Sequence, residues 1–110
     1  MAGKPGSDYV NGMRKDDAIR FLSERAEAIR ALGATSLYLF GSVVRDEARE
    51  TSDLDLFIDY DASKKFSLLD LIGLKLFLEE ELLLDVDVTT RNSLHPRLRE
   101  RIEQTAVQVF

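Results

Sequence analysis

Two aspartates separated by one residue are the first candidates for chemistry in this chain. Asp53 and Asp55 begin the segment DLDLFIDY, whose apolar and polar residues alternate as they do in a β-strand. Alternate residues project from one face of a strand, so the two carboxylates would stand roughly 6–7 Å apart along the backbone. Such carboxylates repel each other unless a cation lies between them, and Mg²⁺ prefers oxygen ligands. The spacing fits a magnesium site, although two acids on the solvated face of an amphipathic strand would give the same pattern.

A second candidate is the pair Gly41-Ser42, which directly follows the apolar segment SLYLF at residues 36–40. That segment is predicted to be a buried strand, and Ser42 can cap a short helix over residues 43–49. A helix start presents free backbone N–H groups that bind phosphate oxygens, and a glycine lets the phosphate come close to the backbone. Taken alone, the pair is equally an ordinary turn with a capping serine. Together with the two aspartates it describes a phosphate site beside a metal site.

These two features, at this spacing, resemble the signature of the DNA polymerase β-like nucleotidyltransferases. The segment LFGSVVR at residues 39–45, a gap of ten residues after Ser42, and then DLDL at residues 53–56 carry the resemblance. The small size and the form SDLDL are similar to the minimal nucleotidyltransferases, typically the antitoxins of MNT–HEPN toxin–antitoxin pairs. The resemblance extends from about Ile19 to Val109, nearly the whole chain.

The resemblance also implies which residues act. Asp53 and Asp55 would be catalytic and would bind two Mg²⁺ ions, together with a third acid on the strand that follows the long helix. The segment Val86-Asp87-Val88 matches that third position best, and Asp85 is the rival candidate on the same face. Gly41 and Ser42 would bind the phosphates of ATP. Arg45 matches a recurrent family arginine and would either contact phosphate or pair with a nearby acid.

The activity implied is Mg²⁺-dependent transfer of a nucleoside monophosphate, most simply AMP from ATP, to a hydroxyl group. In the family the acceptor is a tyrosine of the cognate HEPN toxin, whose ribonuclease activity is then silenced. One alternative is an antitoxin that neutralises its partner by contact alone. Another is transfer to a small molecule, although such relatives usually carry an extra domain that this length does not accommodate.

Composition limits the other function classes. The 110 residues contain no cysteine, which excludes disulfides and thiolate metal sites and is compatible with a cytoplasmic location. The sequence has no run of about 18 apolar residues, so no membrane span is expected. The net charge of −5, without a long basic cluster, argues against general nucleic-acid binding.

Hydrophobic periodicity predicts the elements that position these residues. We expect an α/β (α+β) nucleotidyltransferase fold, with a small mixed sheet of about three strands and helices packed on it. Residues 1–13 are predicted to be a flexible tail, and residues 14–110 a single domain. The predicted helices span residues 14–34, residues 67–82 and a last segment with Pro96 in its first turn. Ser67, with Asp70 three residues later, resembles a capping box at the start of the second of these helices. The predicted strands span residues 36–40, 53–60 and 83–90, and residues 107–110 either add a short strand or pack against the others.

Several polar residues are not expected to take part in the site. Asp59 is predicted to be solvated, because it lies roughly 13 Å beyond Asp55 at 3.3 Å per residue. Residues 79–81, three glutamates at a helix end, are predicted to be a solvated face that opposes the helix dipole. His95 is predicted to be a helix-entry residue, and the pattern leaves the role of Arg91 open.

Overall fold

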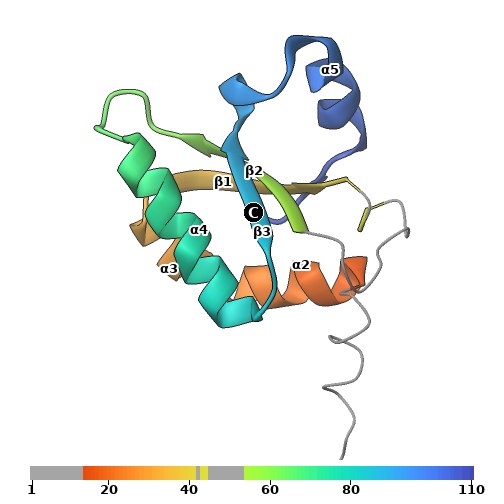
Figure 1. Ribbon diagram of the computed structural model, residues 1–110, viewed down its shortest axis with the longest axis horizontal. Helices are drawn as coiled ribbons and strands as arrows, with labels where there is room; N and C mark the ends of the chain where they lie inside the picture. The colour runs from red at the N-terminus through yellow and green to blue at the C-terminus, as the bar shows by residue number, and fades with distance from the viewer. Residues whose placement is uncertain (1–13, 42, 45–53) are drawn as a thin grey trace, which may run out of the picture.

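A four-stranded mixed sheet forms the centre of the computed structural model, which describes residues 14–41, 43–44 and 54–110 (Figure 1). Its order is β3-β2-β1-β4. β1 (Ala34–Phe40) runs antiparallel to β2 (Leu54–Tyr60), and β2 runs parallel to β3 (Val86–Thr90). The predicted tail over residues 1–13 and most of the helix predicted over residues 43–49 lie outside the described residues.

The C-terminal segment adds a fourth strand to the three that were expected. β4 (Val107–Gln108) pairs antiparallel with β1, with Val107 opposite Leu39. Its neighbours extend the ladder, since the Val109 N–H donates to the Leu37 carbonyl at 2.8 Å and the Leu37 N–H donates to the Phe110 carbonyl at 3.1 Å. The mixed sheet is therefore confirmed, with one strand more than predicted.

Three helices cover one face of the sheet, as Figure 1 shows. They are α2 (Lys15–Glu24), α3 (Ala26–Ala31) and α4 (Leu68–Leu82). The apolar residues of β2 that face them, Leu54, Leu56 and Ile58, are almost completely buried in one cluster with Leu74 and Leu78 of α4. Burial of this apolar surface is the main force that holds the two layers together. The residues between them on β2, including Asp55, therefore face the opposite side of the sheet.

The remaining elements lie beyond the end of β3. A short 3-10 helix, η1 (Arg91–Ser93), leads to α5 (Pro96–Thr105), which stands apart from the other helices in Figure 1. The predicted entry to α5 is confirmed, because Pro96 occupies its first turn and the His95 imidazole accepts a hydrogen bond from the Arg97 N–H at 3.2 Å. Among the described residues, no helix is long and apolar enough to cross a membrane.

The single helix predicted over residues 14–34 is wrong, because the chain forms two helices that break at Arg25. Arg25 has φ −107° and ψ 14°, and its N–H donates to Leu22 rather than to Phe21. The Phe21 carbonyl instead accepts a bond of 3.0 Å from the Arg25 guanidinium, which also lies over the Phe21 ring and reaches Glu81 of α4 at 2.9 Å. The side chain thus replaces the backbone donor that a continuous helix would supply.

The third strand also begins later than predicted, at Val86 instead of Leu83. Leu83 has a left-handed backbone with φ 57°, and its N–H donates to the Glu79 carbonyl at 2.9 Å. This conformation ends α4 in the way that a C-terminal cap does. The chain can then turn back toward β2.

The start of α4 carries the predicted capping box. The Ser67 hydroxyl accepts from the Asp70 N–H at 3.3 Å, and the Asp70 carboxylate accepts from the Ser67 N–H at 2.7 Å. Each bond satisfies a backbone donor that the helix cannot satisfy itself. The capping box is therefore confirmed.

We predict that Ser67→Ala lowers the free energy of unfolding by about 0.5–2 kcal/mol, because it removes the acceptor for the Asp70 N–H. Urea denaturation followed by circular dichroism measures the change. Ser23→Ala, at an exposed serine inside α2, is the control and should not lower stability. Equal destabilisation by the two substitutions would contradict a capping role for Ser67.

Candidate active site

Two acids of the predicted set lie side by side on the sheet face opposite the three helices. In the parallel pairing of β2 with β3, Asp55 is the direct partner of Asp87. Paired residues project to the same side, and neighbouring strands lie about 4.8 Å apart. Asp55 is half-buried and Asp87 is exposed, so the pair is open to a ligand from solvent. Two carboxylates in this arrangement repel each other and favour a cation between them.

The glycine of the predicted phosphate site packs against Asp55, one acid of this pair. Gly41 follows β1 with φ +84°, a conformation that L side chains rarely adopt. A Cβ at this position would overlap the Asp55 Oδ2 oxygen and would lie 3.1 Å from its Cγ. The absence of a side chain is therefore what lets the backbone after β1 reach the Asp55 carboxylate. Gly41 of the predicted phosphate site and Asp55 of the predicted metal site are therefore in contact in the structure.

The rival acids Asp85 and Asp87 occupy different positions. Asp85 precedes β3, and its backbone carbonyl accepts from the Leu54 N–H at 3.1 Å at the start of the parallel ladder. Asp87 lies within the strand, opposite Asp55. The register thus supports Asp87 as the third acid, whereas Asp85 joins the pairing through its backbone.

The other predicted site residues, Ser42, Arg45 and Asp53, lie outside the described residues. Within residues 14–41, 43–44 and 54–110, no group of three or more His, Cys, Asp or Glu side chains could hold a metal ion. The donors that are described, Asp55 and Asp87, are both carboxylates. Their chemistry fits Mg²⁺, which binds to proteins through one or two carboxylates and keeps its remaining positions for water and phosphate.

A glutamate that was predicted to be solvated supports the strand that carries Asp87. Glu79 of α4 accepts from the Val86 N–H at 3.0 Å and from the Lys75 ammonium at 2.8 Å. The Lys75 bond, followed by the Val86 bond, lowers the pKa of Glu79, and Glu79 in turn raises the pKa of Lys75. Asp85 and Asp87 add to this rise in the pKa of Lys75, so positive charge stands near the acids. The sequence signal for the ion pair between Lys75 and Glu79 was their spacing, because residues four apart on a helix are neighbours on its surface.

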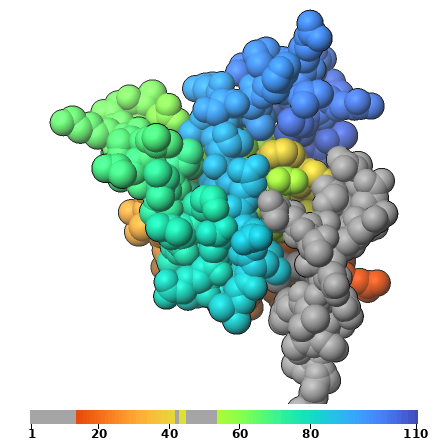
Figure 2. All heavy atoms as spheres, viewed as in Figure 1, coloured from red at the N-terminus to blue at the C-terminus, as the bar shows by residue number. Residues whose placement is uncertain are grey.

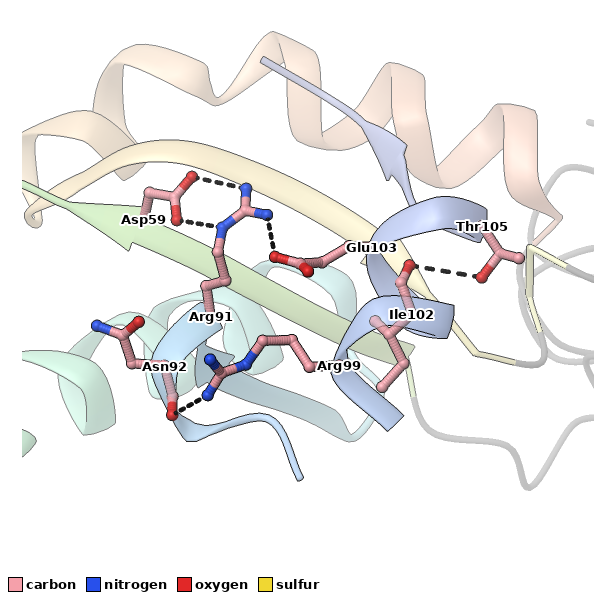
Figure 3. Close-up of polar contacts among 7 residues, drawn as sticks. All are labelled: Asp59, Arg91, Asn92, Arg99, Ile102, Glu103 and Thr105. Carbon is pink, nitrogen blue, oxygen red and sulfur yellow. Dashed lines mark hydrogen bonds and ion pairs between the residues drawn. The ribbon is translucent and has the colours of Figure 1, made fainter. Parts of the chain in front are cut away.

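An arginine organises the other end of the same sheet face, as Figure 3 shows. Arg91 of η1 donates to both carboxylate oxygens of Asp59, at 2.8 and 2.9 Å, and to Glu103 of α5 at 2.7 Å. Its guanidinium also lies 4.8 Å from the centre of the Tyr38 ring and 5.0 Å from that of Phe57. The bonds to Asp59 and then to Glu103 raise the pKa of Arg91. Arg91 therefore ties β2 to α5.

The prediction that Asp59 is solvated is wrong, because this two-point contact with Arg91 holds it. Sequence spacing could not reveal the pair, since 32 residues separate its members. Between this cluster and the acids, Phe57 is fully buried, stacked on Tyr38 with ring centres 4.6 Å apart and tilted against Phe40 at 5.8 Å. The aromatic rings therefore fill the sheet face between Asp55 and the Arg91 cluster.

Comparison with known proteins adds to this geometry. The family model for the nucleotidyltransferase domain matches residues 18–109 of the chain. A Methanocaldococcus jannaschii protein named "putative protein adenylyltransferase" is 48% identical over 78 residues, which cover 71% of this chain and 82% of that protein.

Two solved structures share the fold. A protein described as a "putative minimal nucleotidyltransferase" is 39% identical, with a TM-score of 0.66 and coverage of 87% of this chain and 96% of the other. A chain in the complex of a tri-AMPylated Shewanella oneidensis HEPN toxin with MNT antitoxin has a TM-score of 0.60, covering 84% of this chain and 71% of that one. At 18% identity, the second likeness concerns the fold alone.

We predict that Arg91→Met lowers the free energy of unfolding by about 1–3 kcal/mol, because it leaves the Asp59 carboxylate without its charged donors. Chemical denaturation measures the change. Arg20→Met is the matched control, since its ion pair with Asp17 leaves the arginine side chain 68% exposed. We expect the control to change stability by less than about 0.5 kcal/mol. Equal effects of the two substitutions would show that Arg91 is an ordinary surface arginine.

Proposed function

The chain belongs to the nucleotidyltransferase domain family, and from that premise we propose that it transfers AMP from ATP to a protein hydroxyl group. The acceptor we propose is a tyrosine of a HEPN-type toxin, which makes this chain the antitoxin of the pair. The observation that carries the proposal is the contact of Gly41 with Asp55, which is itself in register with Asp87. In this proposal, the contact brings a phosphate-binding residue next to a carboxylate that binds the divalent cation.

In the proposed mechanism, the carboxylates of Asp53, Asp55 and Asp87 would hold two Mg²⁺ ions. Magnesium bound there would neutralise charge on the triphosphate and lower the pKa of the acceptor hydroxyl. The chain itself positions the reacting groups, which is the main contribution of a protein to phosphoryl transfer.

The residues after β1 bind the nucleotide in this proposal. Gly41 lets the triphosphate approach the backbone, and Ser42 and Arg45 contact its phosphate oxygens. The acceptor hydroxyl then attacks the α-phosphorus, and pyrophosphate leaves as AMP is joined to the acceptor oxygen.

Two considerations support a protein acceptor. The sheet face that carries Asp55 and Asp87 is open beside Asp87, whose side chain is exposed. The structural neighbour from Shewanella oneidensis is a complex of a HEPN toxin with an MNT antitoxin, in which the toxin is AMPylated. Both considerations favour a partner that brings the acceptor hydroxyl to the site.

We predict that the chain, incubated with Mg²⁺, α-labelled ATP and a HEPN-type protein encoded beside it, transfers label to that protein. Asp87→Asn should lower the rate by about 100-fold or more, because it removes charge where the phosphates react. Asp85→Asn is the matched control, with the same chemical change two residues away, and should retain transfer.

Two results would contradict this proposal in different ways. A toxin that is bound and silenced without acquiring label would show that neutralisation occurs by contact alone. Equal loss of transfer in the two variants would show that Asp87, despite its register with Asp55, contributes no more than Asp85.

We further predict that Gly41→Ala lowers the transfer rate by about 100-fold or more, since the added Cβ displaces the Asp55 carboxylate and a shift of about 1 Å is that costly. Rates are compared in the same assay, with thermal unfolding as the check on folding. Gly73→Ala on α4 is the control, because a Cβ there meets no atom within 4 Å. Full activity of Gly41→Ala would show that the contact with Asp55 is unimportant.

A further inference from the structure

The outer face of α4 is an apolar surface that the fold leaves uncovered. Leu69, Ile72 and Leu76 are 78%, 41% and 58% exposed, and Leu83 just after the helix is 88% exposed. The inner residues Leu74, Leu78 and Leu82 are buried, so leucines occupy both sides of this helix. Helices on a protein surface usually have a polar outer face, and clustered exposed apolar residues mark contact sites.

These outer residues, which we call the α4 stripe (Leu69, Ile72, Leu76 and Leu83), have the spacing of a helix-pairing surface. Leu69 and Leu76 stand seven residues apart on α4, and Ile72 stands between them, as in the seam of paired helices, while Leu83 follows just after the helix ends. Gly73 lies beside the middle of the stripe, and a Cβ there would meet no atom within 4 Å. A second helix could therefore come close to the backbone of α4 at this point.

The charges at the two ends of the stripe indicate which occupant fits. The exposed residues Lys64 and Lys65 lie in the loop before the Ser67 cap of α4, and the exposed Glu80 follows Leu76 by four residues on the same side of the helix. If a second α4 lies antiparallel across the first, the basic start of each helix meets the acidic end of the other. In an antiparallel arrangement the two helix dipoles also point in opposite directions, which is the favourable orientation. A parallel arrangement would place like charges together.

We propose that the α4 stripe is the surface on which a second copy of this chain docks, with the two α4 helices antiparallel about a twofold axis. Such an interface is self-complementary, so one patch with opposite charges at its ends satisfies both subunits. The position of α4 supports a second copy over a substrate protein. α4 packs on the sheet face opposite Asp55 and Asp87, so the dimer leaves both active sites accessible.

The space-filling view shows the surface available for this contact. In Figure 2 the α4 segment forms the outer surface on one side of the molecule. α5, which belongs to the other side of the sheet in Figure 1, does not approach it. The proposed contact and the acceptor site therefore use different parts of the molecule.

The first test is sedimentation velocity of the full chain over a range of micromolar concentrations. We expect a monomer–dimer equilibrium, and we expect Leu76→Glu to raise the dissociation constant about tenfold or more. Leu98→Glu on α5 is the matched control, since Leu98 is also about half exposed, at 49%, and should leave the equilibrium unchanged. Circular dichroism verifies that both variants are folded.

The second test identifies the occupant. Lys65→Glu and Glu80→Lys should each raise the dissociation constant roughly three- to tenfold, because each places like charges together twice in the dimer. The two substitutions combined in one chain should restore wild-type association. A wild-type chain that stays monomeric, or a double variant without restoration, would overturn the proposal. Loss of HEPN-partner binding in Leu76→Glu, with the free chain monomeric, would overturn it in favour of a toxin-binding surface.

Discussion

The register of Asp55 with Asp87 is the constraint on which the candidate site depends. Their register places two carboxylates on adjacent strands, directly opposite each other and facing the same side. Two acids directly opposite each other add no attraction between the strands, so other contacts hold the two strands together. The strands are held mainly from behind, where Leu54, Leu56 and the apolar residues of β3 are buried beneath the helices.

The helix between β2 and β3 determines how the second acid reaches the first. α4 begins at a capping box and ends at the left-handed Leu83, so its length and direction are defined at both ends. Glu79 then binds the Val86 N–H, one residue before Asp87. Because α4 is a crossover helix, β3 runs parallel to β2. The two acids therefore lie side by side on adjacent strands.

The opposite end of β2 is fixed by a different kind of interaction. Asp59 pairs with Arg91, and Arg91 pairs with Glu103, so η1 and α5 are held against the sheet by charged hydrogen bonds. The stacked ring of Phe57 separates this cluster from Asp55. One strand therefore carries acids in two different settings: Asp59 pairs with an arginine, and Asp55 lies against the backbone of Gly41.

The sequence by itself determined the local features, because their causes lie within a few residues. It specified the Gly41 turn, the capping box at Ser67 and the alternation of β2, and its motif indicated nucleotidyl transfer. Only the tertiary structure decided which residues meet across long separations. Examples are the register of Asp55 with Asp87, the two-point bond from Arg91 to Asp59, and the break at Arg25, whose side chain takes the Phe21 carbonyl and reaches Glu81. These contacts depend on how the layers pack, and packing is a property of the whole fold that no short window of sequence contains.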